Sequence, residues 1–188
     1  MISALLLAAA LAIPGNFLLY EKDAAKKDDN PETTWTVSAR KSAKLVVNPC
    51  DKAALGARGR TAAKTITYTA VPDFAKYEQV ILYSSEGAAA AAMSDLRAAL
   101  RACGTKGYRF KGAKALLGDD GLMVIGQTHQ GAKPAIGGER AIVARRANAL
   151  ILYSQAGEWG KPAKADFKQQ TGDAKRMLAK ICDIAACD

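Results

Sequence analysis

Stretches in which apolar and polar residues alternate are typical of strands with one buried face. Residues 34–38 show this alternation, and residues 64–71 repeat it. Residues 77–83 are more continuously apolar. Such a run is expected of a central strand that is covered on both faces of its sheet.

Two segments follow the spacing of amphipathic helices. The first begins at residues 84–86, where a serine hydroxyl can cap the helix, and ends at Cys103 before Gly104. The second spans Pro162–Cys182. Gly172 in its middle lowers the stability of this helix by about 1 kcal/mol relative to alanine.

The region between the two helices predicts further strands. Residues 122–127 form a predicted strand, and residues 130–138, rich in glycine, a predicted loop. Residues 140–146 and 149–153 predict two strands joined by a tight turn at residues 147–148, where an asparagine tolerates a positive φ.

These elements follow the order strands, helix, strands, helix. The helices are too few to connect every pair of strands by a crossover, so most neighbouring strands should be antiparallel. The sequence therefore predicts an α+β fold, a mostly antiparallel β-sheet with two long helices packed on it. We expect an N-terminal apolar segment and charged loop over residues 1–32, and a single domain over residues 33–188.

The N-terminal segment has two interpretations. Residues 2–13 form a continuous apolar run that is too short to span a bilayer of about 30 Å. The run is similar to the apolar region of a secretory signal, but no Lys or Arg precedes it. The alternative, which we prefer, is an amphipathic or buried helix that stops at residues 14–15, in a chain whose export signal has been removed. Residues 21–32 predict a mobile loop without a binding role.

Four cysteines accompanied by a single histidine favour disulfide bridges over a metal site. Cys103 and Cys182 each fall on the apolar stripe of a predicted helix. A bridge between them would staple the two helices and leave Cys50 to pair with Cys187. The local alternative, Cys182 with Cys187, requires the helix to unwind just after Ile181.

The same cysteines predict where the protein resides. Disulfides persist in oxidising compartments, so we expect an extracellular or cell-envelope protein, either secreted or a membrane-anchored ectodomain. The competing interpretation is four free thiols, buried as small apolar groups in a cytosolic protein.

The formal charge of +9 on 188 residues favours anionic partners, such as acidic cell-wall polymer, lipid headgroups or a phosphorylated ligand. The lysines are scattered and interleaved with acids, which argues against a nucleic-acid groove. A solvated basic surface is the plainer interpretation of this charge.

The chain carries no recognisable catalytic signature. It lacks the Gly-x-Ser-x-Gly elbow and the ending of a phosphate-binding P-loop, and His129 has no evident Asp or Ser partner. Glu78, Glu86 and Glu139 could form an acid–base pair, but the sequence gives no reason to choose among them. We therefore predict no catalytic residue, no metal site and no cofactor.

A binding site is easier to support. Guanidinium groups pair well with carboxylate or phosphate, and tyrosines offer a flat surface with a hydroxyl. Trp159, between two glycines, either anchors a loop on the core or forms the rim of a cleft. The arginines could also decorate the solvent face of the sheet. The predicted ligand-binding residues are Tyr83, Arg140, Arg145, Arg146, Tyr153 and Trp159.

The middle and the end of the chain are similar to a known family. The similarity is carried by residues 77–80, the helix segment 95–100 with Cys103, the turn 118–120, and the strand 142–145 with Asn148 at its turn. This order resembles the PknH-like extracellular sensor domains, found on mycobacterial receptor kinases and in secreted or lipid-anchored actinobacterial proteins. It covers roughly residues 50–182. Relatives tend to have Gly-Asn where this chain has Ala147-Asn148.

The resemblance implies an antiparallel sheet flanked by helices, two disulfides, and a cleft that receives an extracellular ligand. A bridge between the helix ends agrees with the pairing of Cys103 with Cys182. The resemblance does not identify the ligand or the signalling partner.

Three functions compete on these grounds. The first, which we favour, is a non-enzymatic extracytoplasmic sensor or ligand-binding domain for an anionic small molecule or cell-wall fragment. The second is a basic envelope protein that adheres to acidic polymer or lipid without a defined pocket. The third is an unrecognised hydrolase, which would need two carboxylates about 5–10 Å apart across a cleft.

Overall fold

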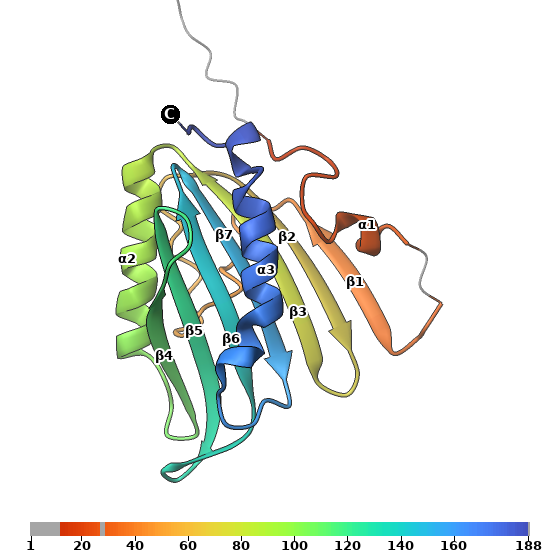
Figure 1. The fold of residues 1–188 in the computed structure, drawn as a ribbon, viewed down its shortest axis with the longest axis vertical. Coiled ribbons are helices and arrows are strands. Elements are labelled where there is room, and N and C mark those ends of the chain that lie inside the picture. The colour runs from red at the N-terminus through yellow and green to blue at the C-terminus, as the bar shows by residue number, and fades with distance from the viewer. Residues whose placement is uncertain (1–11, 27–28, 188) are drawn as a thin grey trace, which may run out of the picture.

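The computed structural model describes residues 12–26 and 29–187. They form a seven-stranded sheet with helices on both of its faces (Figure 1). The elements are α1 (Glu21–Ala24), β1 (Thr33–Ser38), β2 (Arg60–Ala70), β3 (Phe74–Tyr83), α2 (Glu86–Ala102), β4 (Tyr108–Ala115), β5 (Asp120–Gln130), β6 (Lys133–Arg146), β7 (Ala149–Gly157), η1 (Lys164–Phe167), α3 (Lys168–Leu178) and η2 (Ile181–Asp183). No helix in this part of the chain is long and apolar enough to cross a membrane.

The strands lie in the order β1-β2-β3-β7-β6-β5-β4, and each neighbouring pair is antiparallel. β7 occupies the middle of the sheet, and its first seven residues are buried. In β3, Val80 and Leu82 face one core, whereas Ile81 and Tyr83 face the other. The prediction of a strand covered on both faces is therefore confirmed, because alternate side chains of a strand point to opposite faces.

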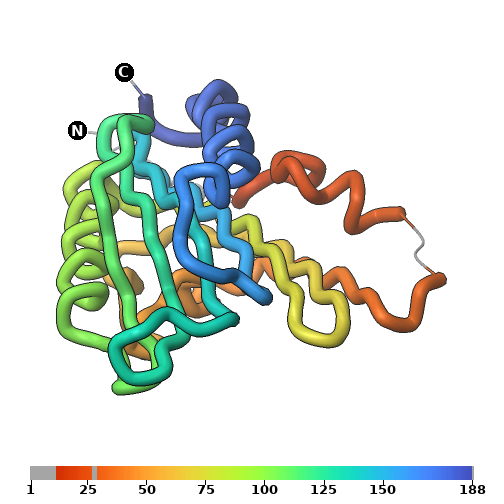
Figure 2. The backbone as a smooth tube through the Cα atoms, turned by 60° about the horizontal axis from the view of Figure 1, so that its bottom comes forward, coloured from red at the N-terminus to blue at the C-terminus, as the bar shows by residue number. Residues whose placement is uncertain are grey.

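Each face of the sheet carries its own apolar core. The α3-side core joins the sheet to α3, η2 and the N-terminal residues 17–20, and includes Phe17, Tyr153, Phe167, Met177 and Ile181. The α2-side core joins the sheet to α2 and the segment before β2, and includes Leu45, Val47, Met93, Leu96 and Leu152. Figure 2 shows α3 and the N-terminal segment together on one side of the sheet.

The prediction of two long helices is wrong. α2 is long, at 17 residues, and Ser85 caps it by accepting a hydrogen bond of 3.1 Å from the amide of Ala88. The predicted helix Pro162–Cys182 instead divides into η1, the 11-residue α3, and η2. α3 ends at Leu178, and the amide of Lys180 then donates to the carbonyl of Met177, three residues earlier, at 3.0 Å. Ile181, which follows this tighter turn, is completely buried in the α3-side core.

The predicted pairing of the cysteines is also wrong. The disulfides are Cys50–Cys103 and Cys182–Cys187, with Cα–Cα distances of 5.2 and 5.4 Å. A bridge between Cys103 and Cys182 would have to join α2 and α3, which lie on opposite faces of the sheet. The helices are therefore not stapled to each other. The local alternative occurs, and the helix does unwind near Ile181.

Two turns differ from their prediction. The predicted loop 130–138 is mostly strand, since β6 begins at Lys133 and the β5–β6 turn is formed around Gly131 with φ of 63°. In the β6–β7 turn the positive φ, 48°, belongs to Ala147 and not to Asn148. Asn148 serves as a hydrogen-bonding residue, and its Nδ2 donates to the carbonyl of Tyr83 at 2.7 Å.

The N-terminal predictions fall partly outside the described residues, because residues 1–11 of the apolar run are not among them. Residues 17–20 pack into the α3-side core. The charged segment begins with α1, where Glu21 pairs with the nearly buried Lys64 of β2. This ion pair attaches the start of the charged segment to the sheet.

Candidate binding groove between α2 and β4

Arg140, a predicted ligand-binding residue, is completely buried. All five of its guanidinium N–H donors are used within the protein. The acceptors, at 2.8–3.1 Å, are Oδ2 of Asp166, Oε1 of Gln127, and the backbone carbonyls of Gly126, Glu139 and Gly160. Arg140 therefore has no donor left for a ligand in this structure, and it ties β5, β6 and the loop after β7 together.

Tyr83 and Tyr153 are buried on opposite faces of the sheet. The hydroxyl of Tyr83 donates to the carbonyl of Gly56 at 2.8 Å, and that of Tyr153 donates to Oε1 of Glu78 at 2.5 Å. Burial is the main cause that raises the pKa of both phenols. The two hydroxyls therefore do not point into the same cleft.

Arg145 and Arg146 hold the β6–β7 turn. Arg145 donates to Glu86 at 2.8 Å and to the carbonyl of Ala147 at 2.9 Å, and Arg146 pairs with Asp119 at 2.9 Å. Trp159 lies near the other end of β7, after Gly157. The structure thus brings Arg140 close to Trp159, with the guanidinium carbon 5.3 Å from the ring centroid, and joins Arg145 and Arg146 at Asp119. It does not gather the six predicted binding residues at one common site.

The carboxylates considered for acid–base chemistry do not face one another. Glu78 bonds to Tyr153 in the α3-side core, and burial raises its pKa. Glu139 shares the opposite face of the sheet with Ala141 and Val143. Burial raises the pKa of Glu139 to about 7. In the described residues, no group of three or more His, Cys, Asp or Glu side chains could hold a metal ion.

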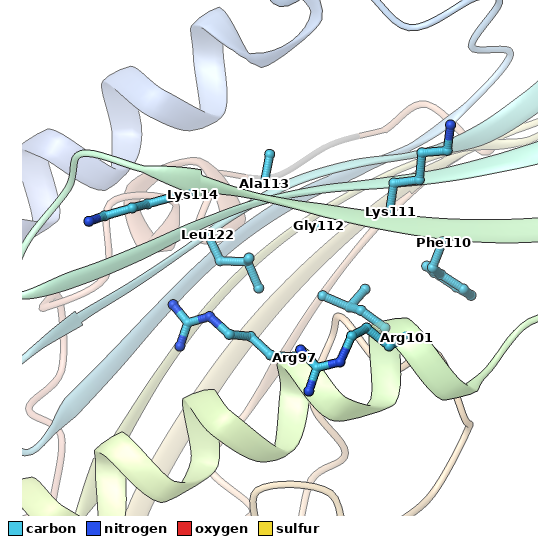
Figure 3. Close-up of a pocket in the computed structure, with 9 residues that line it drawn as sticks. Arg97, Arg101, Phe110, Lys111, Gly112, Ala113, Lys114 and Leu122 are labelled. Carbon is cyan, nitrogen blue, oxygen red and sulfur yellow. The ribbon is translucent and has the colours of Figure 1, made fainter.

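A groove that sequence reasoning missed lies between α2 and β4, at one edge of the sheet (Figure 3). It encloses about 570 Å³. Its lining residues come from α2, β4 and β5, and are Arg97, Leu100, Arg101, Phe110, Lys111, Gly112, Ala113, Lys114 and Leu122. We call this cavity the α2–β4 groove.

The floor of the groove is apolar, and its open space depends on the absence of a side chain at Gly112. Leu100 and Leu122 are almost completely buried beneath it. A Cβ at Gly112 would lie 3.1 Å from Cδ1 of Leu100 and 3.3 Å from Cδ1 of Leu122. A glycine inside a strand often marks a place where a ligand or another backbone approaches closely. Gly112 therefore keeps the floor open.

Cationic side chains surround this floor. Arg97 is committed to Asp120, with which it makes two hydrogen bonds, and this pairing is the main reason that the pKa of Asp120 is lowered. Arg101 and Lys114 make no salt bridge in the described part of the chain, and the charge of Lys114 helps to lower the pKa of the nearby Asp120. Figure 3 shows Lys111 pointing away from α2, so it contributes charge from the other side of β4.

The sequence contains a signal for this groove. Tyr108, Phe110 and Gly112 alternate with Arg109 and Lys111, which is the pattern of a strand. The helix before it places Arg97 and Arg101 four residues apart, hence on one face. Identifying the strand would have placed both sets of residues together at the sheet edge.

No protein-family model matches the chain, and no curated protein matches it in sequence. Among solved structures, the chain is similar to the extracellular domain of PknH from Mycobacterium tuberculosis, with 14% identity over 78% of each chain and a TM-score of 0.49. We draw no functional assignment from a likeness at this level. The resemblance to PknH-like sensor domains stays a prediction.

Proposed function

We propose that this protein is an extracytoplasmic binding domain, and that the α2–β4 groove takes an anionic ligand that carries an apolar group. The observation that supports the proposal is the pairing of an open apolar floor at Gly112 with the uncommitted cations Arg101 and Lys114. Ligand pockets are mostly apolar with a few placed polar groups, and this groove has that composition.

The location follows from the cysteines. Both pairs are joined as disulfides, and no cysteine is free. Disulfides persist in oxidising compartments, which indicates an extracellular or envelope protein. Such a location suits a domain that senses or carries a ligand outside the cytoplasm.

The positive charge of the groove favours a negatively charged ligand. Of the four cationic residues that line it, Arg97 is paired with Asp120 and Lys111 points away from α2, which leaves Arg101 and Lys114 to face a ligand. No acidic residue is among the described residues of the lining. A guanidinium such as that of Arg101 offers paired donors that match a phosphate or carboxylate. The buried leucines beneath would contact an aliphatic or aromatic portion of the same ligand.

The experiment is thermal unfolding of the oxidised protein with hexyl phosphate, with inorganic phosphate and hexanol as separate controls. A ligand that binds only the folded state raises Tm by mass action. Hexyl phosphate should raise Tm more than either control. If hexyl phosphate leaves Tm unchanged, the proposal is wrong.

Variants distinguish a groove from a generally basic surface. Arg101→Gln with Lys114→Gln, and separately Gly112→Val, should abolish the shift caused by hexyl phosphate. Arg40→Gln with Lys41→Gln removes the same charge from an exposed loop remote from the groove and should leave the shift intact. An equal loss in both charge variants would favour adhesion without a pocket instead.

A further inference from the structure

A second cavity, of about 810 Å³, lies on the α3 side of the sheet between α3 and the loop that follows β7. Trp159 of that loop lines it. We propose that this cavity, the Trp159 pocket, binds a neutral saccharide whose ring stacks against the indole of Trp159. The proposal is independent of the α2–β4 groove.

The indole is held in place before any ligand arrives. Its Nε1 donates to the carbonyl of Gln155 at 3.2 Å, and the guanidinium carbon of Arg140 lies 5.3 Å from the ring centroid. The carbonyl of Trp159 accepts from the amide of Gly137 at 3.0 Å. A group already ordered in this way loses little conformational freedom on binding.

The charges around the Trp159 pocket balance. Asp166 and Asp173 supply two carboxylates, and Lys168 and Arg176 supply two cations. Asp173 and Arg176 are paired with each other. Asp166 is paired with Arg140, so both carboxylates already have a cationic partner. A neutral ligand with many hydroxyl groups needs no further charge from such a pocket.

Donors and acceptors lie beside the aromatic ring. Gln155 and Gln169 are joined by a hydrogen bond of 2.8 Å, which fixes both amides at the cavity wall. Among the described residues, Asp166 accepts from Arg140 and from the amide of Ala163 through Oδ2 alone, so Oδ1 can accept from a ligand. A sugar ring has an apolar C–H face and a hydroxyl-bearing edge, which match an indole with polar neighbours.

Gly172 is a further feature of the Trp159 pocket. It lies inside α3, where glycine costs about 1 kcal/mol relative to alanine. A Cβ built at Gly172 would meet no atom within 4 Å, so no contact within the protein requires a glycine here. Gly172 lines the Trp159 pocket. Gly172 is exposed, so the space beside it is open to solvent, and a bound saccharide would lie in this space.

The test uses the two tryptophans of the chain as separate reporters. In a ¹H–¹⁵N spectrum each indole gives one signal, and that of Trp35 in β1 serves as the internal reference. Titration with tri-N-acetylchitotriose, and separately with maltotriose, should move the Trp159 signal with at least one sugar and leave Trp35 in place. If neither sugar moves the Trp159 signal at millimolar concentration, or if both indoles move together, the proposal is overturned.

A variant separates binding from stability. Gly172→Leu places a side chain in the cavity and improves helix propensity, so Tm should be unchanged or higher while saccharide affinity falls by about tenfold or more. Lys175→Leu, on α3 but outside the cavity lining, should bind like the parent protein. Unchanged affinity in Gly172→Leu would overturn the proposal. Arg101→Gln with Lys114→Gln should not affect saccharide binding.

Discussion

The hydroxyl of Ser154 donates a hydrogen bond of 3.0 Å to the carboxylate of Glu139 on the neighbouring strand. This bond favours the charged carboxylate, but burial outweighs it and raises the pKa of Glu139 from 4.5 to about 7. The folded protein therefore holds a proton on Glu139 at pH values where the unfolded chain has released it. This difference makes stability depend on pH.

The first prediction concerns that dependence. Because the folded pKa is the higher one, the contribution of Glu139 is fully present below pH 4.5 and is lost as pH rises toward 7. The loss is up to about 3 kcal/mol. Urea unfolding at several pH values should show the decline in the parent protein and a smaller decline in Glu139→Gln. Glu86→Gln, an exposed control, should keep the parental slope.

The second prediction concerns the β6–β7 turn. Ala147 has φ of 48°, a left-handed conformation that costs a residue with a Cβ about 1–2 kcal/mol. Ala147→Gly should therefore raise the free energy of unfolding by about 1 kcal/mol. Ala91→Gly, at an exposed position in α2, should lower it by a similar amount. Denaturant unfolding checks both, and destabilisation by Ala147→Gly would contradict the expectation.

The third prediction compares the disulfides. Cys50–Cys103 spans 53 residues, whereas Cys182–Cys187 spans 5. Loop-closure entropy gives about 4 kcal/mol for the long bridge and about 2 kcal/mol for the short one. Double Cys→Ala variants of each pair, unfolded under non-reducing conditions, measure the two losses. A larger loss from the short bridge would contradict this order.

The fourth prediction concerns Arg140, whose side chain is completely buried. Arg140→Met removes five hydrogen bonds and leaves Asp166 without its cation, so it should destabilise the fold by about 3–5 kcal/mol. Arg140→Lys should recover only part of this, because an ammonium cannot reproduce the guanidinium fork. Arg146→Lys, at a half-exposed position, should change stability by less than about 0.5 kcal/mol. Equal losses of stability from substituting Arg140 and Arg146 would contradict this prediction.

The sequence predicted the local elements better than their arrangement. The apolar run of β3 and the Ser85 cap of α2 depend on residues that are neighbours in the sequence, and both predictions are confirmed. β4 was missed because it is an edge strand whose side chains are mostly exposed, so its apolar signal is weak. The cysteine pairing failed because helical spacing shows which stripe is buried, but not on which face of the sheet each helix packs.

The candidate sites show the same limit. Arg140 has the chemistry of an anion-binding residue, but its acceptors include residues up to 26 positions away in the sequence. Only the folded chain shows that its donors are used. Conversely, Arg101 and Lys114 become neighbours of one groove only because α2 packs beside β4. The sequence predicts Trp159 as either a loop anchor on the core or the rim of a cleft, and in the structure it lines a cavity.

The disulfide between Cys50 and Cys103 holds one wall of the proposed binding groove. Cys103 is the C-cap of α2, so this covalent link anchors the end of the helix that forms one wall of the α2–β4 groove. A chain in which these two cysteines are reduced lacks this anchor at the last turn of the helix. Under the proposed function, reduction of this bridge would loosen one wall of the groove and weaken ligand binding.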